Sequence, residues 1–212
     1  MLSLVKGGHS KVIEDMITAN NQHEIVGYLD DKYQETTIIN HMYVGPISSL
    51  KELIYIFKEV SFVIGIGNNR IRKNIVTQLN LPKQSYATLI HPSAVISPRA
   101  KIGSGTVIMA NAVVNVDANI GQHSIINTGA IVEHDNRLGN FVHISPNATL
   151  TGTAHIEDGV HVGAGATVIP NITVGEWSVI GGGATVINHI PPYCTAVGVP
   201  AKVISKERVE FV

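Results

Sequence analysis

Residues 126–144 read INTGAIVEHDNRLGNFVHI, and an aliphatic residue recurs at every sixth position of this stretch: Ile126, Val132, Leu138 and Ile144. The spacing continues without a miss in both directions. The other members of the series are Ile90, Ile96, Ile102, Ile108, Val114, Ile120, Leu150, Ile156, Val162, Val168, Val174, Ile180 and Val186. Chance does not produce such a series, so residues 90–186 form an internal repeat with a period of six.

This period fits neither an α-helix, with about 3.6 residues per turn, nor a plain alternating strand. It fits a coil of short strands joined by tight corners, in which each aliphatic side chain points inward and stacks on those of the coils above and below. The fourth residue after each aliphatic one is usually small, and only 5% of the chain is aromatic, as a narrow core requires.

Charged side chains change in frequency along the chain. Residues 1–89 carry 17 of them, whereas residues 90–199 carry 9. This shift in composition places a boundary near residue 88. We therefore expect one domain over residues 1–88 and a second over residues 89–212.

The overall composition excludes several classes of protein. The formal net charge is −1, whereas a nucleic-acid or membrane-surface protein needs a basic excess on one face. Cys194 is the single cysteine, which excludes an internal disulfide and a CxxC site. No uninterrupted run of about 18 apolar residues occurs, and the apolar start is too short for a signal peptide. We expect a soluble, cytoplasmic protein that binds neither nucleic acid nor membrane.

Residues 1–89 alternate between strand and helix patterns. The predicted strands are residues 2–5, 25–29, 62–64 and 86–90, and the predicted helices are residues 10–19, 48–58 and 69–79. This βαβαβ order predicts an α/β domain with a small, Rossmann-like parallel sheet. Ligands of such sheets bind at the carboxyl ends of the strands.

Three strand ends carry candidate ligand-binding residues. They are Gly7, Gly8 and His9 after the first strand, Asp30 and Asp31 after the second, and Gly67 and Asn68 in a glycine turn after the third. Small residues before a helix let backbone N–H groups approach a phosphate, and carboxylates accept hydrogen bonds from a ribose or a base edge. No complete GxGxxG motif occurs, which disfavours NAD.

The repeat resembles that of the hexapeptide-repeat acyltransferases over about residues 90–203, and the closing Gly-Val-Pro-Ala-Lys at residues 198–202 resembles that family's exit from its fold. The resemblance implies a left-handed parallel β-helix with three hexads per coil, in line with the 18-residue spacing of Gly103, Gly121 and Gly139. With its N-terminal half included, the chain resembles the branch of UDP-4-amino-sugar N-acetyltransferases and sialic acid O-acetyltransferases. Within that branch it is most similar to the EpsM-like acetyltransferases of bacterial exopolysaccharide synthesis.

The resemblance also assigns roles in the N-terminal half. In that branch a Gly-Gly-His turn and an Asp-Asp pair hold the UDP-sugar, which implies this role for Gly7, Gly8, His9, Asp30 and Asp31. One departure is visible, because Val5 stands where the branch usually has a glycine, two positions before Gly7.

Five of the ten histidines crowd into the middle of the repeat: His123, His134, His143, His155 and His161. His143 and His161 are 18 residues apart, so we expect them to stack on successive coils in the outward position before an inward aliphatic residue. His134 stands near a corner between Glu133 and Asp135. Acetyl transfer from a thioester to an amine or a hydroxyl needs a base, and a histidine beside a carboxylate supplies one.

This arrangement matches the family's His-acid motif. The resemblance therefore implies that His134 is the proton acceptor and that Asp135 raises its basicity, and it places His143, Ala164 and Gly182 at positions that contact acetyl-CoA. No GxSxG motif is present, so direct attack by the acceptor is preferred to an acyl-enzyme.

We expect an acetyl-CoA-dependent enzyme, without a metal, that acetylates the 4-amino group of a UDP-linked deoxy-amino sugar in bacterial exopolysaccharide or glycan synthesis. Charge-poor, flat coil faces would expose extended apolar surface in a monomer. We therefore also expect a cyclic homotrimer with acetyl-CoA between neighbouring β-helices.

Three other functions stay open. O-acetylation of a sugar such as sialic acid would use the same base on a hydroxyl. A zinc hydratase on the same type of coil would use clustered histidines as ligands. A non-catalytic sugar-nucleotide-binding or scaffolding protein would keep the N-terminal motifs without turnover.

Overall fold

The computed structural model describes residues 2–4, 8–21, 23–57 and 59–206. Its N-terminal part contains β1 (Leu2–Leu4), α1 (Gly8–Asn20), β2 (Gly27–Leu29), β3 (Thr37–Ile39), β4 (Met42–Gly45), the 3-10 helix η1 (Ile47–Ser49), α2 (Leu50–Ile56), β5 (Phe62–Ile64), α3 (Asn69–Leu79) and the 3-10 helix η2 (Lys83–Ser85). The five strands form one sheet in the order β3-β4-β2-β1-β5. All neighbours are parallel except β3 and β4, which are antiparallel.

The Rossmann-like α/β prediction is confirmed in its helices and in its first three strands, which correspond to β1, β2 and β5. The predicted helix over residues 69–79 coincides with α3, whereas the one over residues 48–58 is divided into η1 and α2. Of the strand predicted over residues 86–90, only Leu89–Ile90 forms β6, although Tyr86 makes an isolated bridge to Phe62. The β3–β4 hairpin is missing from the sequence prediction. Val5 and Gly7 lie outside the described residues.

The repeat forms a parallel β-helix, as predicted. Each hexad contributes a two-residue strand, and the chain passes through three sheets in turn before the strand 18 residues later pairs with the first. Coil sheet 1 contains β6 (Leu89–Ile90), β9 (Val107–Ile108), β12 (Ile125–Ile126), β15 (His143–Ile144), β18 (His161–Val162), β21 (Val179–Ile180), β23 (Cys194–Val197) and β24 (Lys202–Lys206). Coil sheet 2 contains β7 (Val95–Ile96), β10 (Val113–Val114), β13 (Ile131–Val132), β16 (Thr149–Leu150), β19 (Thr167–Val168) and β22 (Thr185–Val186). Coil sheet 3 contains β8 (Lys101–Ile102), β11 (Asn119–Ile120), β14 (Arg137–Leu138), β17 (His155–Ile156) and β20 (Thr173–Val174).

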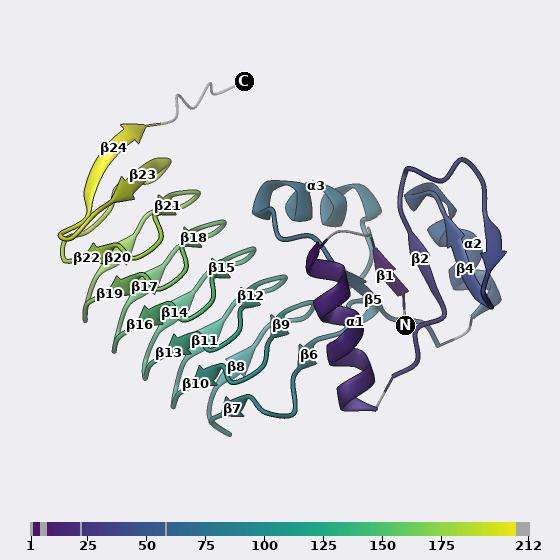
Figure 1. The fold of residues 1–212 in the computed structure, drawn as a ribbon, viewed down its shortest axis with the longest axis horizontal. Coiled ribbons are helices and arrows are strands. Elements are labelled where there is room, and N and C mark those ends of the chain that lie inside the picture. Colours follow the sequence, from purple (N-terminus) through teal and green to yellow (C-terminus); the bar gives the residue numbers. More distant parts are fainter. Residues whose placement is uncertain (1, 5–7, 22, 58, 207–212) are drawn as a thin grey trace.

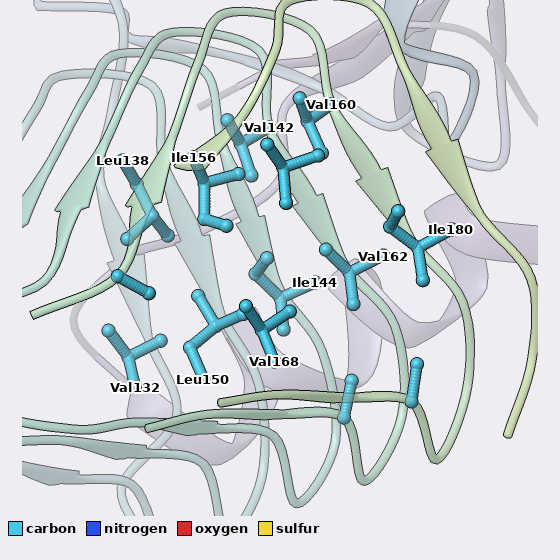
Figure 2. Packing of buried hydrophobic residues seen from close by; sticks show 14 of the residues in the cluster. Val132, Leu138, Val142, Ile144, Leu150, Ile156, Val160, Val162, Val168 and Ile180 are labelled. Carbon is cyan, nitrogen blue, oxygen red and sulfur yellow. The ribbon is translucent and has the colours of Figure 1, made fainter. Parts of the chain in front are cut away.

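The interior of the coil is a column of mostly apolar side chains. The second residue of each strand points inward, and small residues such as Ala130, Ala148 and Ala166 fill the corners beside them. Figure 2 shows Val132, Leu138, Ile144 and Leu150 packed together inside the coil. Burial of this column is the main term that stabilises the coil.

The N-terminal part docks on the outer face of coil sheet 1. There the outward residues Leu89, Val107 and Ile125 are buried against Ile13 and Met16 of α1. Figure 1 shows α1 lying between the N-terminal sheet and the first strands of coil sheet 1, with α3 across the neighbouring coils. No helix among the described residues is long and apolar enough to span a membrane.

Candidate active site

His134 lies on the corner that joins β13 of coil sheet 2 to β14 of coil sheet 3. Its Nδ1 atom is 2.8 Å from Oδ2 of Asp135, and the two side chains are 52% and 56% exposed. A carboxylate only accepts hydrogen bonds, so this contact places the imidazole proton on Nδ1 and leaves a lone pair on Nε2. The pair thus offers an accessible proton acceptor that is oriented by an adjacent anion.

The surroundings of His134 leave room for its ring. A Cβ atom at Gly152, one coil further on, would lie 2.6 Å from both Cε1 and Nε2 of His134. Glu133, on the other side of the histidine, has its carboxylate held by Nδ2 of Asn115 at 2.9 Å. The position of His134 therefore depends on the coils before and after it.

His143 and His161 stack on successive strands of coil sheet 1, as predicted. Their ring centroids are 4.8 Å apart and the interplanar angle is 2°. Nδ1 of His143 donates to the Gly67 carbonyl at 3.2 Å, and Nε2 accepts from Nδ2 of Asn127 at 3.1 Å. Burial, with smaller contributions from His161 and Arg72, lowers the pKa of His143 to about 3. His143 is therefore neutral at physiological pH, with both ring nitrogens engaged.

Arg72 holds the loop after β5 against the coil. It is 1% exposed, and its guanidinium donates to the carbonyls of Ile66 and Gly67 in that loop and of His123 and Phe141 on the coil, at 2.7–3.2 Å. Burial lowers the pKa of Arg72 to about 9, which keeps it charged near neutral pH. Because the bonds of Arg72 reach both halves of the molecule, it ties the predicted substrate loop to coil sheet 1.

Of the predicted residues of the N-terminal part, those that the structure describes fall at the expected sheet edge. His9 lies in the first turn of α1, with its ring 6.3 Å from that of His143. Asn68 caps α3 by accepting from the Ile71 N–H at 3.0 Å. The structure thus brings His9, Gly67 and Asn68 to the face of the coil that carries His143. Gly8 is the first residue of α1.

Asp30 and Asp31 follow β2, at the carboxyl edge of the sheet. Oδ1 of Asp31 accepts from the Ile47 N–H at 2.9 Å, so this carboxylate also anchors η1. Asp30 lies 3.4 Å from Nζ of Lys32.

Ala164 and Gly182 stack at the corners between coil sheets 1 and 2. Gly183 N–H donates to the Ala164 carbonyl at 2.8 Å, and a Cβ at Gly182 would approach that carbonyl to 3.3 Å. Both positions carry little side-chain bulk, so a ligand can lie along this edge.

The structure does not bring His134 to the N-terminal loops of its own chain. The coil has three sheets, and the corner between sheets 2 and 3 lies opposite sheet 1, on which the N-terminal part docks. The proton acceptor and the predicted nucleotide-binding loops therefore face different sides of one protomer.

A pocket of about 230 Å³ lies between the start of α3 and the coil, lined in part by Asn68, His161 and Trp177. Arg70 and Lys73 both stand over the Trp177 ring, at 5.1 and 4.9 Å from its centroid. The sequence analysis missed this basic rim, as well as Arg72 and Asn127. Among the described residues no group of three or more His, Cys, Asp or Glu side chains could hold a metal ion.

Comparisons with family models match both halves of the chain. Residues 4–79 match the PglD N-terminal domain, and residues 153–188 match the bacterial transferase hexapeptide model of six repeats. A curated protein of Bacillus subtilis (strain 168), named UDP-N-acetylbacillosamine N-acetyltransferase, is 48% identical over 101 residues. Those residues are 48% of this chain and 47% of that protein, so the match spans about half the length of the curated relative.

Solved structures match nearly the whole chain. PerB of Caulobacter crescentus, in complex with CoA and GDP-perosamine, is 31% identical, with a TM-score of 0.87 and 96% of each chain covered. The acetyltransferase domain of PglB from Neisseria gonorrhoeae, in complex with acetyl coenzyme A, is 35% identical, with a TM-score of 0.83, and covers 96% of this chain and 98% of that one.

Proposed function

This chain belongs to the hexapeptide-repeat sugar N-acetyltransferases with a PglD-type N-terminal domain, and we propose that it transfers the acetyl group of acetyl-CoA to the 4-amino group of a UDP-linked deoxy-amino sugar. The observation that carries the proposal is the His134–Asp135 pair, with its 2.8 Å hydrogen bond and exposed position. The relative from B. subtilis, which acts on a UDP-linked sugar by its name, supports the choice of nucleotide and of nitrogen as the acceptor.

In the proposed reaction the free-base amine of the sugar attacks the thioester carbonyl carbon of acetyl-CoA. Nε2 of His134 takes the proton that the nitrogen loses as the N–C bond forms, and Asp135 stabilises the resulting imidazolium. The tetrahedral intermediate then collapses with cleavage of the C–S bond. The leaving thiolate of CoA takes up a proton, which His134 can return.

The N-terminal part would hold the nucleotide-linked sugar. Gly7, Gly8 and His9 would approach the phosphates, Asp30 and Asp31 would bind the ribose or the base, and Gly67 and Asn68 would line the sugar side. Parallel β1, β2 and β5 end at one edge of the sheet, which supports a shared site for these residues.

Acetyl-CoA would lie between neighbouring coils of a homotrimer, against His143, Ala164 and Gly182. The placement of the His134 corner opposite the docking face supports such an assembly, because one protomer alone does not join the base to the acceptor site. The named complexes of PerB with CoA and of PglB with acetyl coenzyme A support the co-substrate. We place this reaction in the cytoplasm, in bacterial exopolysaccharide or glycan synthesis.

The direct test is a mass-balance assay of the full chain with acetyl-CoA and a panel of UDP-4-amino sugars, with sialic acid as a hydroxyl acceptor. We expect one amide product per CoA released and no loss of activity after treatment with a chelator. Acetylation of sialic acid alone would move the assignment to O-acetylation. Loss of activity to the chelator would favour a zinc enzyme, and the absence of any product would favour a binding protein.

His134→Ala tests the catalytic assignment. We expect kcat to fall by about 10²–10⁴-fold, the usual contribution of a positioned base, with little change in acetyl-CoA affinity. Asp135→Asn should reduce kcat less, and should have almost no effect in the His134→Ala background, because the pair acts as a unit. A folded His134→Ala variant with near-parental kcat would refute the assignment.

A further inference from the structure

A buried asparagine interrupts the apolar lining of the coil at the corner of His134. Each corner between coil sheets 2 and 3 places its last residue inside the coil, four positions after the inward aliphatic residue of sheet 2. The residues at this position are Ala100, Ala118, Asn136, Ala154, Ile172 and Ile190. Asn136 is the polar member of the row and is 0% exposed.

The Asn136 amide replaces a backbone hydrogen bond of the turn. In the corner one coil earlier, the Ala118 N–H donates to the Asn115 carbonyl at 3.3 Å. In the His134 corner, Nδ2 of Asn136 donates to the equivalent Glu133 carbonyl at 2.7 Å and also to the Thr151 carbonyl of the next coil at 3.0 Å. One side chain therefore holds the carbonyls of two successive corners.

These bonds fix the backbone on which His134 stands. The Glu133 carbonyl belongs to the peptide before His134, and the peptide after it is held because the His134 carbonyl accepts from the Thr153 N–H at 3.0 Å. A peptide group is planar, so fixing its carbonyl fixes its orientation. Asn136 and Thr153 thus restrain both sides of the His134 Cα atom, and Asp135 restrains the ring.

Stability alone does not account for an asparagine at this position. Its Oδ1 atom is buried without a hydrogen-bond partner among the described residues, and a buried, unsatisfied carbonyl is unfavourable. Ala118 and Ala154 occupy the same position in the adjacent coils. An alanine therefore fits this corner, and the amide is present only in the coil that carries the base.

We propose that Asn136 is a positioning residue, which holds the peptide before His134 so that Nε2 of the histidine points at the acceptor amine. This inference rests on the proposed function, in which His134 is the base. Asn136 itself touches no reacting atom, since it lies inside the coil.

The test compares Asn136→Ala with Ser124→Ala in the full chain. Ser124 is a matched control, because its buried hydroxyl also donates to a carbonyl 15 residues further on, that of Gly139 at 3.2 Å, at another corner of the coil. We expect Asn136→Ala to lower kcat by about 10- to 100-fold, as misplacement of a catalytic group does. Its KM for both substrates should stay near the parental values. Its Tm should fall about as far as that of Ser124→Ala, because each substitution removes a buried donor to a carbonyl, and Ser124→Ala should keep the parental kcat.

A double mutant separates positioning from a general structural effect. If Asn136 acts through His134, Asn136→Ala should lower kcat in the parent but not in the His134→Ala background. Parental kcat in a folded Asn136→Ala variant, or an equal fold-loss in both backgrounds, would overturn the inference and leave the proposed base in place. Near-parental kcat in His134→Ala would instead overturn the proposed base, and with it the role of Asn136.

Discussion

At the scale of single residues, histidines that face the contact between the N-terminal part and the coil make the stability of the molecule sensitive to acid. Burial, with Arg72 as a smaller cause, lowers the pKa of His9 and of His123 from 6.5 to about 4, and the pKa of His143 falls to about 3. Between these values and pH 6.5 the unfolded chain binds protons that the folded chain does not. The contribution of these histidines to stability is therefore complete above pH 6.5 and is lost as the pH falls through this window.

His123→Phe tests this linkage. The His123 ring stacks on Phe141 with centroids 5.3 Å apart and meets Tyr86 edge-on at 4.6 Å, so phenylalanine keeps the aromatic contacts without a titrating group. We expect the free energy of unfolding, measured with urea, to fall between pH 6.5 and 4.5 more steeply in the parent than in His123→Phe. The difference in slope should be about 1.4 kcal/mol per pH unit, because the variant lacks one proton-binding group. Identical slopes in parent and variant would contradict the assignment.

The sequence made the His134–Asp135 pair predictable, because both members are adjacent in the chain and the corner follows from the repeat. It did not make Arg72 predictable. The acceptors of Arg72 include carbonyls 51 and 69 residues away, and nothing local indicates them. The helix pattern is misleading as well, since Arg72 and Asn69 are buried while Ile71 is 49% exposed.

At the scale of elements, α3 is the helix whose polar face docks on the coil. Nδ2 of Asn69 donates to the carbonyls of Gly159 and Val160 at 3.0 and 3.2 Å, and its Oδ1 accepts from Nη2 of Arg72 at 2.8 Å. The docking of such a helix is stable only if its buried polar groups form hydrogen bonds with one another and with the coil.

Asn69→Ala should therefore destabilise the protein, because it leaves the buried Arg72 without one of its acceptors. We expect the free energy of unfolding to fall by about 1–3 kcal/mol. Asn74→Ala, the same substitution at an exposed position of the same helix, should change it by no more than about 0.5 kcal/mol. Urea titration of both variants measures the difference, and equal values for the two would count against the docking role.

The β3–β4 hairpin shows why one element escaped the sequence analysis. Its two turn residues, Asn40 and His41, both have positive φ, at 50° and 64°, as a type I′ turn requires. Asparagine followed by glycine is the usual sequence signal for such a turn. Here histidine takes the place of the glycine, so the sequence does not show this signal. The residues of β3 are also exposed, so no alternation marked them as a strand.

At the scale of the whole molecule, the outward residues of coil sheet 1 change character where the docking element changes from α1 to the loop after β5 and the start of α3. Leu89, Val107 and Ile125 are buried under α1, whereas the next two strands present His143 and His161. Equivalent outward positions of one sheet thus form an apolar contact surface in the first coils and a polar surface in the later ones. The repeat predicted the inward residues because their environment is set by the coil itself, but what covers the outward residues depends on docking.

The separation of His134 from the N-terminal loops predicts an active site shared between protomers. Light scattering should give three times the chain mass of 22.7 kDa. A stable monomer in dilute solution would contradict the trimer.

Subunit mixing tests the sharing itself. His134→Ala lacks the proposed base. Asp30→Ala/Asp31→Ala should lack acceptor binding while it keeps acetyl-CoA binding, because the two proposed sites draw on different parts of the chain. A homotrimer of either variant alone should be nearly inactive. If each site combines the His134 corner of one protomer with the N-terminal loops of the next, an equimolar mixture of the two variants, unfolded and refolded together, should recover roughly a quarter of the parental activity. A site contained within one chain predicts no recovery, because every chain in the mixture carries one of the two defects.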